Sequence, residues 1–257
     1  MTKFMKSLGS RAILVVTVLF LGPSVLAAPL SLKPREILDK VDDLFRGEAN
    51  QGRMTMTITT AHWKRKLSLE FQNKGRDKAL YRIVSPKKEK GTATLRSGKE
   101  IWNYLPKIKR VIKLPSSMMS ASWMGSHFSN DDLVKQTRMA DDFSYKVTHG
   151  SYKNQKAVVE ITCIPHPEAA VVWGKVVVRV RKPDFLPLVI LYYDEDLNLA
   201  RTFTYMNVRH LGGRTLPTMI KVVPTDKPNE STVVEFQEIT FDLPLEDRLF
   251  SLRNLQR

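Results

Sequence analysis

The sequence predicts a mainly β protein built on one antiparallel sheet, and three observations support this prediction. Apolar and polar side chains alternate with a period of two over most of the chain, which is typical of antiparallel strands with one face in water. About eleven to thirteen such runs follow one another, separated by turns rich in Gly, Pro, Asn and Asp. No internal repeat, low-complexity tract or linker interrupts them. We therefore expect a single β domain.

The first 27 residues are predicted to be a secretory signal peptide. Lys3, Lys6 and Arg11 precede an apolar run at residues 12–21, which is too short to span a bilayer comfortably. Small residues end the segment at Ala27, near which we expect cleavage. The alternative is an uncleaved membrane anchor. With cleavage, residues 28–257 are expected to form one domain located outside the cytoplasm.

Charge and cysteine content narrow the function further. The formal net charge of +15 becomes +12 (15 − 3) without the basic residues of the signal peptide. A basic surface often indicates nucleic acid, but an exported protein rarely meets any, so we expect no nucleic-acid partner. Anionic lipid headgroups, envelope glycolipids or acidic proteins fit better, and solubility alone is the alternative. The single cysteine, Cys163, excludes an internal disulfide and is predicted to be a buried structural thiol.

The mature chain is expected to begin with an amphipathic helix. Residues 34–46 place their apolar side chains on one helical face, with Pro34 suited to the first turn and Gly47 to the end. The helix needs a sheet on which to pack. From Gly52 onward the period changes to two, which predicts strands at residues 53–60, 64–73 and 78–84, with a turn at residues 74–77 between the second and the third.

Residues 91–133 organise the rest of the chain. Strands are expected at residues 92–96, 100–105 and 108–114. A loop dense in Met and aromatic side chains follows, and burying each such side chain is worth roughly 1.5–3 kcal/mol, so the loop should not lie in water. Either it packs as ordinary core or it roofs a lipid cavity, because Met adapts to irregular apolar partners. The apolar residues of the loop are Met118, Met119, Trp123, Met124 and Phe128.

The remainder reads as sheet with two further short helices. Asp131 or Asp132 can cap a helix that runs to about Arg138. The glycine pair at 212–213 is typical of a hairpin turn. A last helix is expected at residues 245–252. Strands are predicted at residues 143–147, in the run that holds Cys163, and at residues 171–181, 188–194, 200–207, 216–223 and 232–241.

Two segments resemble the periplasmic outer-membrane lipoprotein-sorting proteins, the LolA-like family. The segment SGKEIWNYLPKIKRV is similar to that family's strand–turn–strand, and MGSHFSNDDL resembles its GSDFS-x-x-DL form, with His127 where an acidic residue is common. The matching residues of the two segments are Gly98, Lys99, Ile101, Trp102, Tyr104 and Pro106, then Gly125, Ser126, Phe128, Ser129, Asp132 and Leu133. In outline the resemblance extends over the whole mature chain.

The resemblance implies a half-open antiparallel β-barrel of about eleven strands, with short helices covering its concave face. It also implies a carrier that takes up the acyl chains of a lipid or lipoprotein and moves them toward the outer membrane. An Arg near the turn between the second and third strands holds the lid in the best-known members, and Lys74 or Arg76 takes that place here. We predict lipid contacts from Leu69, Phe71, Trp102, Met118, Met119, Trp123, Met124 and Phe128.

The expected partners are a lipid or an acylated lipoprotein, an inner-membrane transporter and an outer-membrane acceptor, with the chain itself a monomer. We expect no cofactor, metal or catalytic residues. The histidines are scattered without metal-ligand spacing, and no nucleophile elbow, phosphate loop or dinucleotide fingerprint occurs. The alternative function is a non-enzymatic adaptor subunit of an envelope transport complex, docking through a basic edge such as residues 87–90. An envelope hydrolase is a third hypothesis.

Overall fold

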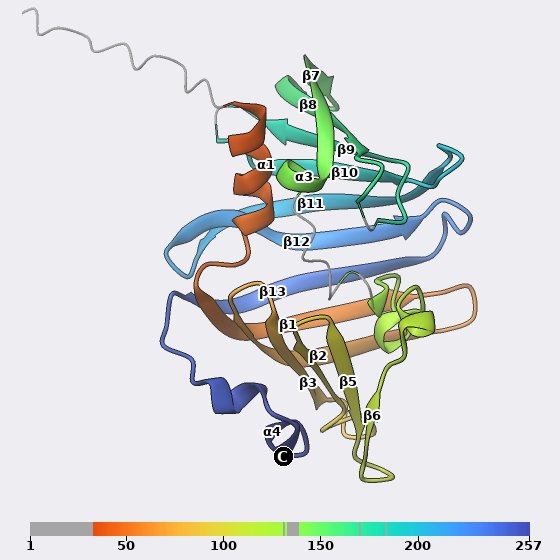
Figure 1. The fold of residues 1–257 in the computed structure, drawn as a ribbon, viewed down its shortest axis with the longest axis vertical. Coiled ribbons are helices and arrows are strands. Elements are labelled where there is room, and N and C mark those ends of the chain that lie inside the picture. The colour runs from red at the N-terminus through yellow and green to blue at the C-terminus, as the bar shows by residue number, and fades with distance from the viewer. Residues whose placement is uncertain (1–32, 131, 133–138, 170, 183) are drawn as a thin grey trace, which may run out of the picture. The chain divides into compact units, whose positions relative to one another are not determined.

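Thirteen antiparallel strands form one sheet in this computed structural model, which describes residues 33–130, 132, 139–169, 171–182 and 184–257 (Figure 1). The predicted signal peptide, residues 1–27, and most of the helix expected up to Arg138 lie outside the described residues. The strands are β1 (Ala49–Thr59), β2 (Lys64–Lys74), β3 (Lys78–Ser85), β4 (Ala93–Ser97), β5 (Glu100–Leu105), β6 (Arg110–Lys113), β7 (Phe143–Tyr152), β8 (Gln155–Pro165), β9 (Lys175–Arg181), β10 (Pro187–Tyr193), β11 (Leu199–Leu211), β12 (Arg214–Pro224) and β13 (Ser231–Phe241).

The strand order explains why one connection crosses the sheet. The order is β6-β5-β4-β3-β2-β1-β13-β12-β11-β10-β9-β8-β7, so the two halves of the chain meet where β1 pairs with β13. The edge strands β6 and β7 follow each other in sequence but lie at opposite ends of the sheet. Residues 114–142 therefore connect the two edges of the sheet. This connection contains the Met-rich and aromatic loop.

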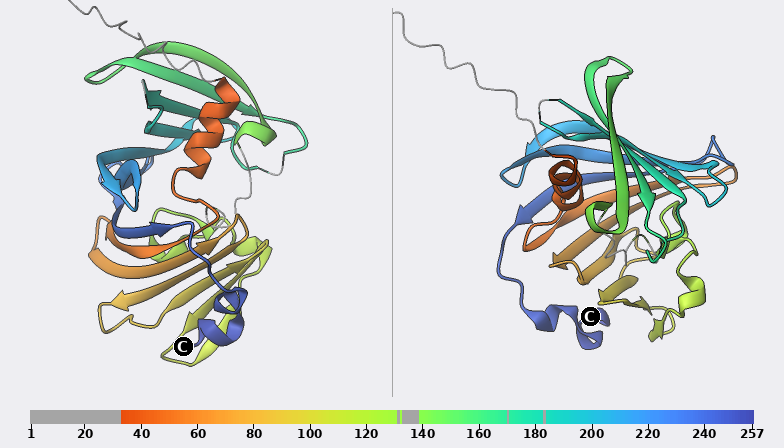
Figure 2. Two further views of the ribbon diagram at one scale, coloured as in Figure 1. Left: turned by 90° about the vertical axis from the view of Figure 1, so that its left-hand side faces the viewer. Right: turned by 45° about the horizontal axis from the view of Figure 1, so that its top comes forward.

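The sheet is strongly curved and open, and two of its helices lie on its inner side. Figure 2 shows both ends of the sheet bending toward the side on which α1 (Pro34–Asp43) and α3 (Met139–Asp142) lie. We call this side the inner face. The half-open antiparallel architecture expected from the sequence is confirmed. The strand count is 13 rather than about eleven, and every strand predicted from alternation overlaps one of the 13.

The first helix forms where the apolar pattern predicts it and ends three residues earlier. Pro34 occupies the first turn, where its missing N–H is no loss, and the Lys33 N–H donates to Glu36 Oε2 at 2.8 Å. Ile37, Leu38 and Val41 are buried against strands β8 to β12. The helical register stops at Asp43, and the chain turns into β1 through Gly47 at φ +90°.

Two glycines permit the strands at the centre of the sheet to approach closely. A Cβ at Gly52 on β1 would lie 1.9 Å from the carbonyl oxygen of Glu238 on β13. The strand register shifts beside this contact, between Arg53 and Met54. At Gly212, where φ is +59°, a Cβ would lie 2.3 Å from the carbonyl oxygen of Ile239. Only glycine fits these two positions, and the predicted hairpin at 212–213 is confirmed.

The outer face of β3, β4 and β5 is covered by the C-terminal segment. The predicted last helix is replaced by a 3-10 turn, η3 (Asp247–Phe250), and a short helix, α4 (Leu252–Leu255). Arg82 on β3 donates to the carbonyl oxygens of Leu255 and Asn254, at 3.2 and 2.8 Å, and so binds the end of this helix. A separate apolar cluster lies beneath it, formed by Ala49, Leu80, Ala93, Leu95, Leu245, Phe250 and Leu255.

Candidate functional site

A cavity of about 360 Å³ lies on the inner face, between α1, the crossing connection and the sheet. Its size falls within the range of small-molecule sites, roughly 300–1,000 Å³. Side chains from both halves of the sheet line it, so the cavity exists only because β1 pairs with β13. Its apolar lining comprises Val41, Phe45, Met54, Phe71, Ala79, Tyr81, Trp123, Phe128, Met139, Phe143, Val171, Trp173, Val176, Ile190, Tyr192, Phe203, Tyr205, Ile220, Val234 and Phe236.

Aromatic rings form most of the cavity wall. Phe45, just after α1, stacks on Phe236 of β13 with ring centroids 5.1 Å apart, and Phe71 of β2 meets Phe236 edge-on at 5.8 Å. On the other side, Tyr192 of β10 and Phe203 of β11 lie 5.1 Å apart. Burial raises the pKa of Tyr192, which keeps its phenol neutral. The wall therefore offers a largely apolar, aromatic surface.

Residues 116–130, which we call the flap, form a compact loop over one side of the cavity. The flap holds itself together, since Asn130 Nδ2 donates to the carbonyl oxygens of Met118 and Ala121 at 3.0 and 3.2 Å. Trp123 is 3% exposed and donates from Nε1 to Thr94 Oγ1 of β4 at 3.1 Å. Its ring meets Tyr81 at 5.1 Å. Trp123 is thus a core residue and also part of the cavity wall. Packing as core and covering a cavity, which the sequence analysis treated as alternatives, therefore occur together at this residue.

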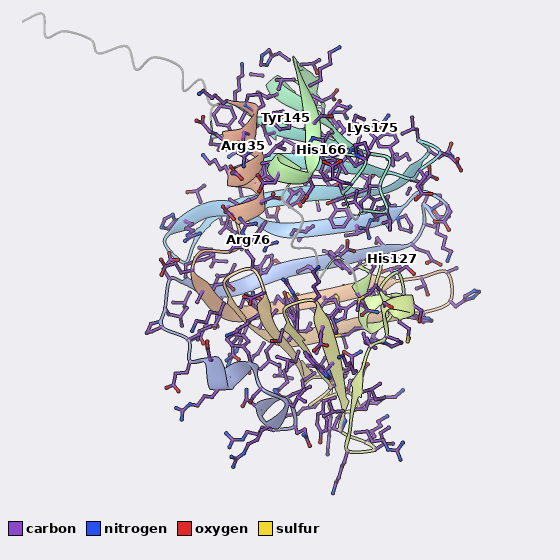
Figure 3. The ribbon with its side chains drawn as sticks, in the orientation of Figure 1. Arg35, Arg76, His127, Tyr145, His166 and Lys175 are labelled. Carbon is purple, nitrogen blue, oxygen red and sulfur yellow. The ribbon has the colours of Figure 1, made fainter. Side chains whose placement is uncertain are left out.

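Further polar contacts, made by Arg65 and His127, fix the flap to the sheet. Arg65 on β2 donates to the Met124 carbonyl oxygen at 2.8 Å and forms an ion pair with Glu89 at 3.2 Å. His127 places Nδ1 2.8 Å from Thr232 Oγ1 on β13 and Nε2 3.2 Å from Glu230, and the position of His127 is visible in Figure 3. The His127 amide also donates to Thr232 Oγ1 at 3.0 Å.

The segment after the flap is fixed by a buried ion pair. Arg201 on β11 donates to both carboxylate oxygens of Asp132, at 2.8 and 2.6 Å. The guanidinium also lies over the rings of Trp173, Tyr192 and Phe203, at 4.6 to 5.1 Å from their centroids. The side chains of the pair are only 10% and 14% exposed. This contact fastens the crossing connection to the middle of the C-terminal half of the sheet.

Polar groups collect at one end of the cavity, near the end of α1 and the β2–β3 turn. Asp42, Arg46, Asn73, Lys78 and Arg96 line this end. Burial raises the pKa of Asp42 from 3.8 to about 6, although nearby Arg46 and the Met139 N–H, 3.2 Å away, oppose the shift. Burial also lowers the pKa of Arg96. The cavity therefore has an aromatic body and one charged end.

The structure brings together some of the residues predicted for lipid contact and separates others. Phe71, Trp123 and Phe128 line the cavity. Leu69 is fully buried behind the wall, and Met124 packs against the same cluster. Three residues lie elsewhere in the fold: Met118, which is 45% exposed on the flap; Met119, half-buried beside it; and Trp102.

Trp102 lies on the outer face, away from the cavity. It pairs across the strands with Leu95, and directly paired residues share a face of the sheet. Leu95 belongs to the cluster under the C-terminal segment, and Trp102 packs against that cluster. Alternation along β5 shows which of its residues share a face, but it does not show whether that face is the inner or the outer one. That depends on the pairing of β5 with β4, which the sequence did not reveal.

Lys74 and Arg76, predicted to hold the lid, bind two other parts of the chain. Lys74 Nζ donates to the Leu245 carbonyl oxygen at 2.8 Å and to Asp247 at 2.7 Å, which fastens the C-terminal segment. Arg76 forms an ion pair with Asp43 at the end of α1, where Figure 3 labels it. The crossing connection is instead held at Asp132 by Arg201.

Several residues of the site were missed by sequence reasoning. They are the cavity residues Phe45, Tyr192, Phe203 and Phe236, and Arg201, which lies behind the lining and holds Asp132. The signal was present in part, because Arg201, Phe203 and Tyr205 have the same parity on one strand and so share its inner face. Whether these side chains lie near Phe45 and Phe236 depends on the order of the strands in the sheet. The alternation of apolar and polar residues does not predict that order.

Potential metal ligands do not cluster in the described part of the chain. Within it, no group of three or more His, Cys, Asp or Glu side chains could hold a metal ion. Among the same residues, no helix combines the length and the apolar character that crossing a bilayer requires.

Comparisons with known proteins agree on the fold. Residues 75–257 match a family model described as "-like: Uncharacterized protein". No curated protein matches the chain. Among solved structures, an outer membrane lipoprotein-sorting protein domain from Vibrio parahaemolyticus is 23% identical with a TM-score of 0.73, over 87% of this chain and 98% of that one.

Two further solved structures are similar over nearly their whole length. A DUF1329 family protein from Desulfovibrio piger ATCC 29098 is 21% identical with a TM-score of 0.76, covering 86% of this chain and 97% of its own. A LolA superfamily protein from Nitrosomonas europaea is 20% identical with a TM-score of 0.71, covering 87% and 100%. At these identities the likeness establishes the fold.

Proposed function

The chain belongs to the family of the matched model and has the LolA-like fold, and from this premise we propose that it is a carrier of acyl chains. The cargo is a lipid or the acyl group of a lipoprotein, bound in the aromatic cavity and moved through the periplasm toward the outer membrane. The protein acts without catalysis, as a monomer. An inner-membrane donor and an outer-membrane acceptor would load and unload it.

One observation carries this proposal: an aromatic cavity of about 360 Å³ lies between the flap, α1 and both halves of the sheet. An apolar wall of this kind gains free energy by excluding water when an alkyl chain occupies it. The wall residues Phe45, Phe71 and Phe236 come from three separate elements, so the hollow is part of the fold.

The proposal is tested by titrating the purified mature chain with 1-monomyristoylglycerol, a neutral single-chain lipid, in a calorimeter. We expect saturable binding to one site. Ile220→Trp fills the cavity from β12 and should weaken binding by at least about tenfold, since a packed cavity has no room for the chain. The matched control is Val208→Trp, at a side chain that is 37% exposed on β11 and outside the cavity lining, which should bind normally.

Native mass spectrometry of protein extracted from the periplasm provides a second readout. A bound lipid that the Ile220→Trp variant lacks would support the carrier function. Absence of binding by the wild-type chain to both neutral and charged lipids would end the proposal. Equal binding by the Ile220→Trp and Val208→Trp variants would place the lipid outside the cavity.

A further inference from the structure

The charged end of the cavity keeps a net positive charge after its ion pairs are counted. Its lining contains three cations and two carboxylates, namely Arg46, Lys78 and Arg96 against Asp42 and Asp132. Asp132 is neutralised by Arg201, and Lys78 by Asp247 at 3.0 Å, and neither partner lines the cavity. The other charged groups of the lining are Arg46, Arg96 and Asp42.

Arg46 is the cation that faces the cavity without an ion pair. Among the described residues, its guanidinium forms no salt bridge or side-chain hydrogen bond, although it is half-buried and lines the cavity. It lies near enough to Asp42 and Arg96 to influence the pKa of both. A half-buried cation that is left without a partner is unfavourable unless a ligand or water satisfies it.

The backbone at Arg46 is held in place by a buried network. Asn50, which is 1% exposed, donates from Nδ2 to the carbonyl oxygens of Phe45 and Arg46, both at 2.8 Å. Asn73 on β2 donates in turn to Asn50 Oδ1 at 2.8 Å. Phe45, the neighbour of Arg46, is part of the aromatic wall. The chain therefore fixes two neighbouring residues at the cavity. The Phe45 ring lies in its aromatic body, and the Arg46 side chain lies at its charged end.

We propose that the cavity selects a single-chain anionic amphiphile, whose carboxylate or phosphate is bound by Arg46 with Arg96 behind it. The inference rests on the carrier function proposed above and adds the charge and the number of chains of the ligand. A guanidinium is the side chain best suited to carboxylate and phosphate, because its donors match two oxygens at once. A neutral headgroup would leave Arg46 unsatisfied.

The volume of the cavity indicates one chain. A cavity of about 150 Å³ holds one benzene molecule, so about 360 Å³ holds roughly fourteen carbon atoms. That matches one alkyl chain of medium length. A lipid with two or three long chains would have to leave most of its apolar surface outside this cavity or open the flap.

The experiment compares two probes of equal chain length, sodium tetradecanoate and 1-monomyristoylglycerol, by calorimetry at pH 7.5 below their aggregation concentrations. Wild type should bind the carboxylate more tightly. Arg46→Gln should weaken carboxylate binding roughly tenfold, as expected for losing a charge-assisted hydrogen bond, and leave the monoglyceride unchanged. Arg46→Lys keeps the charge and should restore part of the loss. Arg53→Gln, an exposed arginine on β1 outside the cavity lining, is the matched control.

The outcomes separate the inference from the function on which it rests. If wild type binds both probes equally, or if Arg46→Gln leaves carboxylate binding unchanged, the anionic selectivity is wrong while the carrier function stands. If neither probe binds, the carrier function itself fails. Tetradecyl phosphate, added as a third probe, distinguishes a phosphate from a carboxylate headgroup. A diacyl phospholipid that binds more tightly than either single-chain anion would overturn the single-chain inference.

Discussion

Arg201 and Asp132 form a bidentate ion pair, with nitrogen–oxygen distances of 2.8 and 2.6 Å, between the middle of the sheet and the chain that crosses it. Asp132 belongs to the only stretch that connects the edge strands β6 and β7, as the strand order requires. The pair therefore fastens the chain after the flap to β11, the strand whose Phe203 lines the cavity. It is buried among Trp173, Tyr192 and Phe203, where water cannot replace a lost partner.

Asp132→Asn should destabilise the protein by roughly 2–4 kcal/mol, because the substitution leaves a buried guanidinium without its counter-charge. Urea denaturation followed by tryptophan fluorescence measures this loss. The double variant Asp132→Asn with Arg201→Met removes both charges and should recover a large part of it, since the unpaired charge is what is unfavourable. A double variant as unstable as the sum of the two single variants would show that the pair itself contributes little.

Thr232→Val should loosen the flap with little effect on the sheet. Thr232 is fully buried, and its Oγ1 meets both the amide nitrogen and Nδ1 of His127, at 3.0 and 2.8 Å. Losing these hydrogen bonds is worth roughly 1–2 kcal/mol, which corresponds to a 5- to 30-fold faster opening. The rate of hydrogen exchange at the His127 amide measures this opening. Thr240→Val, at an exposed position of the same strand, is the control and should leave the exchange unchanged.

Asp42 should make stability depend on pH between about 4 and 6. Its pKa is about 6 in the folded protein against 3.8 for an exposed carboxyl, so the folded state binds the proton more tightly. The stability from this group is then greatest at low pH and falls as the pH rises through 6. Asp42→Asn removes the buried charge while keeping an acceptor for the Met139 N–H. It should stabilise the protein by about 1–3 kcal/mol at pH 7.5 and by almost nothing at pH 4.

The charged groups around Asp42 are Arg46 and Asp43 on its own segment and Arg76 from the β2–β3 turn. Denaturation curves for wild type and Asp42→Asn across the pH range isolate the contribution of Asp42 from these groups. Asp226→Asn, at an exposed loop position, should change stability little at any pH. A stability difference for Asp42→Asn that does not vary with pH would contradict the raised pKa.

Cys163 should not react with a thiol reagent in the folded protein. The side chain is fully buried on β8, and burial raises the pKa of its thiol to about 12, so almost no thiolate is available. Reaction with dithionitrobenzoate should be slow under native conditions and should reach one equivalent in concentrated guanidinium chloride. Cys163 is the single cysteine of the chain, so the assay needs no variant. Rapid, complete labelling of the folded protein would contradict the buried, structural role.

The elements of this fold could be predicted because each follows from local chemistry. Alternation placed all 13 strands, and the 3.6-residue period placed α1 with Pro34 at its start. Errors appear where a local pattern has two physical meanings. Trp102 fits an apolar face equally well on either side of the sheet, and the structure places it on the outer face. Residues 245–252 have the pattern of one helix, but Ser251 ends the 3-10 turn and caps the separate helix α4.

The sequence by itself determined a mainly β fold, an early helix, a buried cysteine and an aromatic loop between the sixth and seventh strands. Only the tertiary structure decided which aromatic rings meet, because β1 pairs with β13 across more than 170 residues of chain. That pairing places Phe45, Phe236 and Phe203 around one cavity, and the strand order leaves residues 114–142 to connect the two edges of the sheet. Strand alternation records which side chains share a face, but the free energy that selects strand order comes from contacts between distant segments, and a local pattern does not contain them.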